Sequence, residues 1–488
     1  MVASAATDSL SGHFHRIWLN RRALGLVEVC RKQNVPHMSQ NIPPANGVTR
    51  RGFLSSSGTL LGAAAIGTLA IDRVAFAQGS SELKIALIGC GGRGSGAANQ
   101  ALNVPGTRLV AVADAFPDRL NSSLNNLKEQ HGAKVDVPAE RQFVGLDGYK
   151  QAIALADVCI LATPPGFRPL HFEEAVRQGK NIFMEKPVAT DAAGIRRVLA
   201  AAEIAKQKNL KVGVGLQRHH QAGYLETIKR LHDGAIGDIH SLRVYWNDGG
   251  VWNYPREAVA KMLGHEPTEI EYQMKNWYYF NWLCGDHINE QHIHNLDVGC
   301  WVKNGYPVRA RGLGGRQVRT EKQYGEIFDH HAVEYQFADG SWMFSQCRHI
   351  RGAWSSVSEY AQGSKGQCDI SGHMIKPSSG DAWRFRSDKQ VDPYQQEHFD
   401  LFEAIRSNTA YNEAFNGAKS TMTAILGRMA TYSGTEVTWD EALNSKVVLT
   451  PDDYDHLTFN SKVKSLPDSE GRYAIAVPGN SEWRKRIV

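Results

Sequence analysis

Short apolar runs alternate with longer amphipathic segments along the first half of the chain. Residues 85–88, 109–113 and 158–163 are continuous apolar or small-residue runs with the length of buried strands. Between them, residues 118–131 and 169–178 have the spacing of amphipathic helices. Strands that alternate with helices are typical of a doubly wound parallel sheet, so the pattern predicts an α/β domain.

The length of the chain indicates more than one domain, because 488 residues exceed the usual size of a single domain. We expect a leader over residues 1–77, a doubly wound α/β domain over 81–208, an α+β domain over 209–450 and an arm over 451–488. The composition, with 42% hydrophobic and 22% charged residues, is that of a soluble globular protein. The net charge of +5 is small and the basic residues are scattered, which argues against a nucleic-acid partner.

The leader carries an arginine pair ahead of a Gly/Ala-rich apolar run. Arg50-Arg51 precedes residues 60–71, and residues 75–77 follow as an A-x-A cleavage site. This arrangement resembles a twin-arginine export signal, and a chance pair before a membrane anchor is the alternative. The run is short and rich in small residues, so we expect no stable membrane span after processing. Met38 is an alternative start, because it gives a charged region of normal length ahead of the pair.

The first apolar run ends in a glycine-rich turn that leads into a small-residue helix. Gly89, Gly91 and Gly94 have the G-x-G-x-x-G spacing, and Gly92 and Arg93 lie between them. In this arrangement the glycines allow a tight turn, the approach of backbone amides to a pyrophosphate, and close packing of helix on strand. Taken alone, the pattern also fits a glycine-rich turn that binds nothing.

A carboxylate at the end of the second run strengthens the nucleotide interpretation. Asp114 lies 25 positions after Gly89 (114 − 89), at the tip of the run 109–113. A carboxylate there accepts hydrogen bonds from both ribose hydroxyls of an adenosine and repels a 2′-phosphate. Ala115 offers no counter-charge beside it. The spacing therefore favours NAD over NADP as the cofactor.

Candidate site residues also follow two further apolar runs. The run 158–163 ends in Pro164 and Pro165, at the carboxyl end of a strand, where ligands of open α/β sheets bind. Farther along, the apolar residues 181–184 lead into Glu185-Lys186-Pro187. A charged pair after a buried strand is costly unless it has partners or a function, although a surface turn is the alternative.

Together these motifs resemble the Gfo/Idh/MocA oxidoreductases, over residues 83–449. The marks of the resemblance are the glycine turn, Thr163-Pro164-Pro165 with His171 downstream, Glu185-Lys186-Pro187, Gly215-Leu216-Gln217-Arg218 and Gly234-Ala235-Ile236-Gly237. The resemblance implies an N-terminal Rossmann domain with a doubly wound parallel sheet, followed by an α+β domain with an open, mainly antiparallel sheet. Strand-like stretches at 239–245, 308–312, 331–337 and 341–346 agree with the second sheet.

The resemblance also implies a cofactor site and a catalytic set. The residues expected to contact NAD are Gly89, Gly91, Gly92, Arg93, Gly94, Asp114, Thr163, Pro164, Pro165, His171, Glu185, Lys186 and Gln217. Lys186 inherits contacts with the nicotinamide ribose and with the substrate hydroxyl. His294 and Glu290 are expected to complete the catalytic set with Lys186.

The segment around His294 departs from the family pattern, which is Asp-x-Gly-x-His with Asp three positions later. Aligned on His294 and Asp297, Glu290 replaces the first acid and His292 replaces the glycine. If the segment is helical, Glu290 and His294 share a face, and the carboxylate orients an imidazole that exchanges a proton near neutral pH.

The same segment admits two other interpretations. Glu290, His292 and His294 are of the types that bind metals, but their spacing matches no established metal motif, so we expect no metal ion. Histidines held by hydrogen bonds in the core are the second alternative.

Aromatic residues crowd the stretch ahead of this segment. Trp252, Trp277 and Trp282 lie among asparagine and aspartate residues. Flat rings beside such groups suit sugars, whose C–H faces are apolar and whose rims form hydrogen bonds. With Arg218 and Asp297 they make up the expected substrate site, and packing of a long loop or of a subunit interface is the alternative.

These expectations describe an exported oxidoreductase that transfers a hydride between NAD and a hydroxyl-bearing ring carbon of a sugar or cyclitol. Because twin-arginine transport carries folded proteins and free NAD is scarce outside the cytoplasm, we expect a tightly held cofactor and a periplasmic or equivalent location. An NAD-dependent glycoside hydrolase that works by transient oxidation and elimination is one alternative. A non-catalytic sugar-binding protein with a vestigial nucleotide site is the other. We also expect a homo-oligomer, a dimer or a tetramer.

Overall fold

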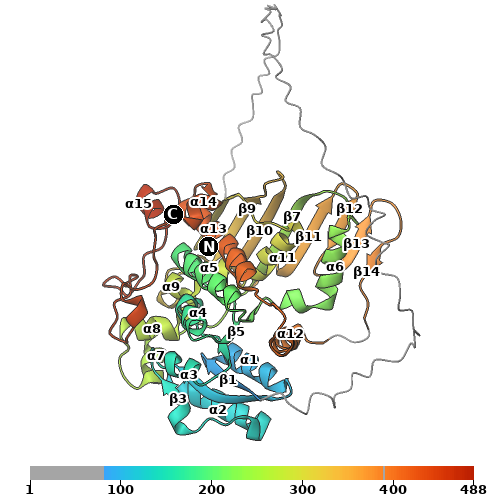
Figure 1. Ribbon diagram of the computed structural model, residues 1–488. Helices are drawn as coiled ribbons and strands as arrows, with labels where there is room; N and C mark the ends of the chain where they lie inside the picture. Colours follow the sequence, from blue (N-terminus) through green and yellow to red (C-terminus); the bar gives the residue numbers. More distant parts are fainter. Residues whose placement is uncertain (1–81, 388–390) are drawn as a thin grey trace, which may run out of the picture. The chain divides into compact units, whose positions relative to one another are not determined.

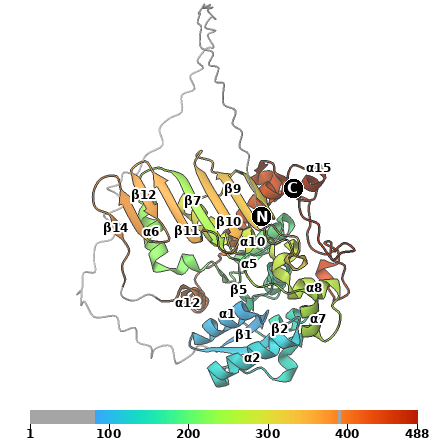
Figure 2. The same cartoon turned by 180° about the vertical axis from the view of Figure 1, so that it is seen from behind.

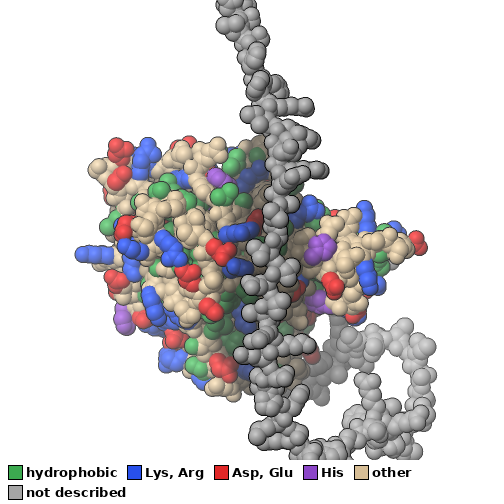
Figure 3. All heavy atoms as spheres, turned by 90° about the horizontal axis from the view of Figure 1, so that it is seen from above, with side chains coloured by type: hydrophobic (Ala, Val, Ile, Leu, Met, Phe, Trp, Pro, Cys, Tyr) green, Lys and Arg blue, Asp and Glu red, His purple; other side chains and the backbone are tan. Residues whose placement is uncertain are grey.

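The computed structural model describes residues 82–387 and 391–488. The leader with its arginine pair, cleavage site and alternative start lies outside these residues, so export stays a prediction. Figure 3 shows acidic and basic side chains interspersed over one face of the molecule, in agreement with the scattered charge of the sequence. Among the described residues we find no helix with the length and apolar character that crossing a bilayer requires.

A six-stranded parallel sheet forms the first domain, as the alternating pattern predicts. Its strand order is β3-β2-β1-β4-β5-β6, and every neighbouring pair is parallel. The strands are β1 (Leu83–Ile88), β2 (Thr107–Asp114), β3 (Gln142–Val144), β4 (Val158–Leu161), β5 (Asn181–Met184) and β6 (Val212–Val214). The strand order reverses between β1 and β4. In such sheets ligands bind beyond the carboxyl ends of the strands at this switch point.

Helices cover both faces of this sheet. Those that connect its strands are α1 (Gly92–Asn103), α2 (Pro117–His131), α3 (Tyr149–Ala154), α4 (Arg168–Arg177) and α5 (Ala192–Gln207). One more helix comes from far along the chain, α12 (Pro393–Ser407), and both Figures 1 and 2 show it beside α1. Leu401 and Phe402 of α12 are buried in one cluster with Ile85 and Leu87 of β1. A helix from the segment 209–450 therefore completes the core of the first domain.

The second domain is built on a nine-stranded, mainly antiparallel sheet, which confirms the predicted fold class. Its order is β14-β13-β12-β11-β7-β10-β9-β8-β15, and only the pair β7 and β10 is parallel within the described sheet. The strands are β7 (Ile239–Asp248), β8 (Arg309–Gly315), β9 (His330–Gln336), β10 (Trp342–His349), β11 (Ser356–Gly363), β12 (Gly366–Asp369), β13 (Met374–Pro377), β14 (Trp383–Arg384) and β15 (Val437–Thr438).

One face of this sheet is covered and the other is open. The covering helices are α6 (Ala222–His232), α11 (Ile293–Lys303) and α13 (Ala414–Ser433), which lie against the sheet in Figure 1. Figure 2 shows the strands from the side without these helices. Leu313 and Trp354 are 79% and 62% exposed. Large exposed apolar side chains are common where chains associate, and the dimer or tetramer stays a prediction.

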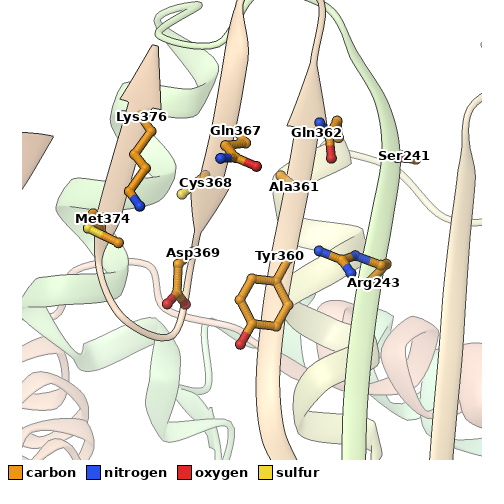
Figure 4. Close-up of a pocket in the computed structure, with 10 residues that line it drawn as sticks. All are labelled: Ser241, Arg243, Tyr360, Ala361, Gln362, Gln367, Cys368, Asp369, Met374 and Lys376. Carbon is orange, nitrogen blue, oxygen red and sulfur yellow. The ribbon is translucent and has the colours of Figure 1, made fainter. Parts of the chain in front are cut away.

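The open face also bears a hollow of about 240 Å³ across β7, β11, β12 and β13. Figure 4 shows Arg243, Tyr360 and Asp369 side by side on neighbouring strands within it. The guanidinium of Arg243 lies 5.2 Å from the centre of the Tyr360 ring. None of the site residues predicted from the sequence lines this hollow, so the chemistry must be sought on the covered side of the sheet.

A long insertion between β7 and α11 bridges the two domains. It contains α7 (Arg256–Leu263), α8 (Glu269–Lys275), α9 (Asn281–Cys284) and α10 (His287–Glu290). The C-terminal arm, with α15 (Ser481–Lys485), follows α14 (Trp439–Leu443), and its residues Tyr454, Leu457 and Tyr473 are buried in one aromatic cluster with the insertion. The arm therefore fixes the insertion in place, and the insertion forms one wall of the cleft described next.

Candidate active site

A cleft of about 700 Å³ lies between the carboxyl ends of β1, β2, β4 and β5 and the second domain. Most of the residues singled out from the sequence line it. They are Gly89, Gly91, Gly92, Arg93, Gly94, Asp114, Thr163, Pro164, Pro165, His171, Glu185, Lys186, Trp252, Trp277, Glu290 and His294. The fold thus brings together residues that are more than 200 positions apart in the sequence.

The glycine turn has the shape that a dinucleotide requires. Gly89 has a φ of +95°, and a Cβ built on it would lie 2.5 Å from the amide nitrogen of Thr163. A Cβ on Gly94 would lie 1.9 Å from the carbonyl oxygen of Gly89, so strand and helix pack too closely for any side chain. At Gly91 and Gly92, a Cβ would meet no heavy atom of the described residues within 4 Å. The backbone is therefore accessible from the cleft.

The first turn of α1 offers its amide groups to the cleft. Gly91 is the N-cap residue and carries no side chain to accept a hydrogen bond from the first amides of the helix. Such free N–H groups, together with the positive end of the helix dipole, bind phosphate oxygens. This uncapped N-terminus fits the pyrophosphate of NAD.

Asp114 lies at the end of β2, where the adenosine ribose is expected. Its carboxylate accepts hydrogen bonds from the backbone amides of Cys90 at 2.7 Å and Phe116 at 2.9 Å. Burial raises the pKa of Asp114, while these hydrogen bonds and the cations of Lys275 and Arg119 oppose the rise. Arg119 also lines the cleft, and sequence reasoning missed it because the cation lies five positions beyond the carboxylate, in the first turn of α2.

A buried arginine joins the ends of β4 and β5 beneath the cleft. The Arg168 guanidinium donates to the carbonyl oxygens of Leu161, Thr163 and Glu185, at 2.5, 2.6 and 2.9 Å. Burial lowers the pKa of Arg168 to about 10, so it remains a cation at neutral pH. Burial and this cation lower the pKa of His171 to about 3, and the neutral ring lies 3.1 Å from the Thr163 hydroxyl. Sequence reasoning found His171 but not Arg168.

Arg93 is anchored by carboxylates of both domains. It forms an ion pair with Glu185 after β5 and another with Glu397 of α12, the latter at 3.2 Å. Its guanidinium also lies 4.8 Å from the centre of the Tyr394 ring. Gln217 donates to the Tyr394 hydroxyl at 3.1 Å and does not line the cleft itself. Gln217 therefore reaches the cleft only through Tyr394, and its contact with the cofactor stays a prediction.

Lys186 meets Glu290 across the domain boundary. Its ammonium donates to the backbone oxygen of Glu290 at 2.7 Å and to a carboxylate oxygen of the same residue at 3.3 Å. The side chains of both residues are 14% exposed. The ammonium that follows β5 is thus held by the last residue of α10.

The expected helical pairing of Glu290 with His294 is wrong. Helix α10 ends at Glu290, and α11 begins at Ile293. The amide of His292 donates to the carbonyl of His287, five residues back, which widens the turn and breaks the 3.6-residue register. Nδ1 of His294 has no hydrogen-bond partner in the described part of the chain, and Glu290 instead contacts Lys186.

The His294 ring still faces the cleft and stays neutral. Burial and the nearby cation of Lys186 hold its pKa well below the usual value for histidine. Burial raises the pKa of Glu290, and Lys186 opposes the rise. Trp246, near the end of β7, lies parallel to the His294 ring with 5.9 Å between ring centres. The site therefore contains an ammonium and an unprotonated imidazole next to an aromatic wall.

The aromatic end of the cleft agrees in part with the sequence expectation. Trp252 and Trp277 line the cleft, and their ring centres are 6.0 Å apart. The Trp252 ring stacks on Tyr254 with 5.2 Å between centres and is 40% exposed. A flat, accessible ring surface therefore lies in the same cleft as Lys186 and His294.

Three expected substrate residues lie elsewhere. Trp282 is 2% exposed, and its indole N–H donates to Gln273 at 2.7 Å in the core behind the cleft. Arg218 is buried in an ion pair with Glu359 of β11. Asp297 accepts hydrogen bonds from three side chains, those of His219, Asn416 and Ser420. The polar groups of these residues form hydrogen bonds or ion pairs within the protein, and none of the three residues lines the cleft.

The alternative metal set is not brought together. Nε2 of His292 lies 2.7 Å from the Ser345 hydroxyl on β10, and the residue is fully buried. Glu290 and His294 line the cleft instead. Burial lowers the pKa of His292 to about 3, which makes it a neutral core histidine.

Comparison with known proteins matches the first domain to a family. Residues 83–216 match the model of the Gfo/Idh/MocA family, described as an oxidoreductase family with an NAD-binding Rossmann fold. The matched segment contains all six strands of the parallel sheet and the glycine turn. The prediction of an NAD-binding Rossmann domain is therefore confirmed.

Individual relatives extend the similarity at lower identity. Over 204 residues the chain is 28% identical to inositol 2-dehydrogenase of Rhizobium meliloti, a match covering 38% of this chain and 57% of that relative. The chain thus spans little more than half the length of this curated relative. Aldose-aldose oxidoreductase of Caulobacter crescentus has a similar fold, with a TM-score of 0.57 at 19% identity, over 73% of this chain and 99% of that chain. Scyllo-inositol dehydrogenase of Lactobacillus casei, with bound NAD(H) and scyllo-inositol, has a TM-score of 0.54 at 19% identity, over 74% of this chain and 100% of that chain.

The two kinds of glycine in the turn predict different effects of alanine on stability. In Gly92→Ala the new methyl group projects into open space, so we expect unchanged thermal stability and at least a roughly tenfold loss of NAD affinity, because it crowds the pyrophosphate. In Gly94→Ala the methyl group collides with the Gly89 carbonyl, so we expect a lower melting temperature as well. Calorimetric titration of cofactor-free protein and thermal unfolding measure both effects. Unchanged NAD affinity in Gly92→Ala would contradict the placement of the pyrophosphate.

Proposed function

We propose that this protein is an NAD-dependent oxidoreductase that transfers a hydride between NAD and a hydroxyl-bearing ring carbon of a sugar or cyclitol. One observation carries the proposal. A single cleft is lined by the uncapped helix N-terminus, by Lys186, Glu290 and His294, and by accessible aromatic rings. These are the parts that a dinucleotide and a polyol need together.

Three side chains that line the cleft, those of Lys186, Glu290 and His294, supply the proton chemistry. When a ring hydroxyl is oxidised, its proton must leave as the hydride leaves the carbon. The neutral imidazole of His294 can accept that proton, and the Lys186 ammonium stabilises the negative charge that develops on the oxygen. Glu290 holds the ammonium in place. Bound NAD would supply the hydride acceptor or donor.

A ring polyol fits the aromatic end of the cleft. Trp252 and Trp277 present flat apolar surfaces, and Gln291 also lines the cleft as a hydrogen-bonding side chain. Relatives of this chain are named for inositol, and solved proteins with a similar fold are named for aldose and scyllo-inositol. Both kinds of ligand carry several hydroxyl groups on a saturated ring, which supports this substrate class.

Loss of the Lys186 ammonium tests the chemistry. We expect Lys186→Met to lower kcat by roughly a hundredfold or more, because the developing oxygen charge loses its counter-charge. Lys229→Met, on the exposed side of α6, is the matched control. Steady-state kinetics with inositols and aldoses measure the effect, with product analysis on an aryl glycoside alongside. Equal turnover in Lys186→Met and the control would refute the proposal, and aglycone release without a keto product would instead favour redox-neutral glycoside hydrolysis.

Two tryptophans separate substrate binding from packing. We expect Trp252→Leu to raise KM for the polyol with little change in melting temperature, because this ring is accessible in the cleft. Trp282→Leu should instead destabilise the fold by about 3 kcal/mol, because it opens a core cavity and leaves Gln273 without its donor. Kinetics and thermal unfolding of the two variants distinguish the roles. An unchanged KM in Trp252→Leu places the substrate elsewhere.

The finer part of the proposal concerns location. We take the protein to be exported by the twin-arginine pathway with NAD tightly held, because Arg50-Arg51 precedes a Gly/Ala-rich run and an A-x-A site. We expect purified protein to release NAD in near-stoichiometric amount on denaturation. We also expect Arg50→Lys with Arg51→Lys to retain the chain in the cytoplasmic fraction. Undiminished export of that variant, or protein free of dinucleotide, would each contradict one half of this expectation.

A further inference from the structure

A buried cluster of one carboxylate and two imidazoles lies behind the cleft, outside the group proposed for catalysis. Asp286 and His287 are at the start of α10, and His331 is in β9. One ligand atom of each residue lies within 4.8 Å of the other two, and all three side chains are fully buried. The sequence analysis assigned no role to these residues, and the proposed function uses none of them.

The contacts of Thr431 favour one tautomer of His331. The Thr431 hydroxyl has a single proton and two carbonyl acceptors in its own helix, those of Gly427 and Arg428, so we assign Nδ1–H of His331 as the donor to its oxygen, at 2.9 Å. Nε2 of His331 is then the acceptor atom of a neutral ring. It lies 3.2 Å from Oδ2 of Asp286. Two lone pairs that face each other at this distance repel unless a cation lies between them.

A proton is poorly placed to serve as that cation. In the described part of the chain, Nε2 of His331 forms no aligned hydrogen bond. A metal ion, which binds along lone pairs and needs no N–H direction, meets the geometry better.

His287 supports the same conclusion independently. Neither of its ring nitrogens has a hydrogen-bond partner among the described residues, although the side chain is fully buried. Nδ1 lies only 2.7 Å from Oδ1 of Asp286, yet the N–H direction is misaligned with the oxygen. Buried polar atoms without partners are rare in folded proteins and usually mark an ion, a water or a functional group.

The backbone at the cluster is held in an uncommon conformation. Asp286 has a φ of +73°, in the left-handed region that residues other than glycine adopt rarely. The Tyr432 hydroxyl and the Phe328 amide hold its carboxylate by donating to Oδ2, at 2.6 and 3.0 Å. Ligand carboxylates and imidazoles in metal sites are oriented by such neighbouring hydrogen bonds, as His331 is here by Thr431.

We propose that Asp286, His287 and His331 bind one divalent first-row transition metal ion, with Zn²⁺ the best match to two imidazoles and one carboxylate. The inference goes beyond the proposed hydride transfer and does not depend on it. The ion offsets the buried negative charge of Asp286. Because His287 and Glu290 are the first and last residues of α10, the ion also fixes the helix that positions the partner of Lys186.

A second connection runs from the cluster to the cleft. The His349 ring stacks on His287, with 4.3 Å between ring centres. Nδ1 of His349 accepts from the Arg319 guanidinium at 3.1 Å, so its Nε2–H donates to the Gln291 side chain at 2.7 Å. Gln291 lines the cleft. The site is therefore a structural metal site, whose loss should disturb α10 and Gln291 without removing any catalytic group.

Metal content of the full chain, purified without a histidine tag or chelator, tests the proposal. Elemental analysis by mass spectrometry should find about one equivalent of a divalent transition metal per chain. His331→Gln and Asp286→Asn should lower this content at least tenfold. His240→Gln, which changes an exposed histidine of β7, is the matched control and should leave it unchanged.

Measurements on the wild-type chain keep the proposal testable if those variants fail to fold. After treatment with a chelator, Co²⁺ alone should restore visible d–d absorption of a nitrogen- and oxygen-ligated ion, and Zn²⁺ alone should raise the melting temperature. Background metal content, together with no spectrum and no shift in melting temperature, overturns the proposal. Metal that persists in His331→Gln also overturns it, because the ion is then bound elsewhere.

Discussion

The position of the Lys186 ammonium is the constraint on which the site depends. Lys186 follows a strand of the first domain, and both of its acceptors belong to Glu290, a residue of the insertion in the second domain. A largely buried ammonium is costly unless acceptors surround it. Separating the two domains would leave this charge without partners, so the contact favours the closed arrangement.

Burial of charge also explains why the first domain requires residues from late in the chain. Arg93 in the glycine turn is paired with Glu185 and with Glu397 of α12. A Cβ on Gly215 would lie 2.6 Å from a carboxylate oxygen of Glu185, so the glycine after β6 provides the space that this carboxylate occupies. The nucleotide turn, the strand ends and α12 thus form one electrostatic unit, and the parallel sheet is not a separable module.

The sequence predicts those features that depend on neighbouring residues. Apolar runs of strand length identify the parallel sheet, and the spacing of Gly89, Gly91 and Gly94 identifies the turn, because both are local consequences of backbone geometry. The roles of buried polar residues could not be predicted in this way. Arg218 resembled a substrate contact, but its partner Glu359 lies 141 positions away. Only the tertiary fold shows that this charge is already paired.

The roles of the aromatic residues likewise depend on the tertiary fold and not on the local sequence. Trp252 and Trp282 are equally plausible from the sequence, since both lie in one aromatic-rich stretch. The structure separates them because the insertion folds back on itself. Trp252 reaches the cleft, and Trp282 packs into the core formed with the C-terminal arm. Composition alone gives no information about that fold-back, which depends on contacts with residues almost 200 positions downstream.

Glu290 and His292, the two departures from the family pattern, lie in one wide turn of the chain. His292 fills the core and bonds Ser345, where the pattern has a glycine with no side chain to bury. The wide turn that ends at the His292 amide separates α10 from α11. Glu290 consequently points to Lys186 and not along the helix to His294. The wide turn therefore gives the carboxylate of Glu290 to the ammonium of Lys186 and leaves Nδ1 of His294 without a partner in the described part of the chain.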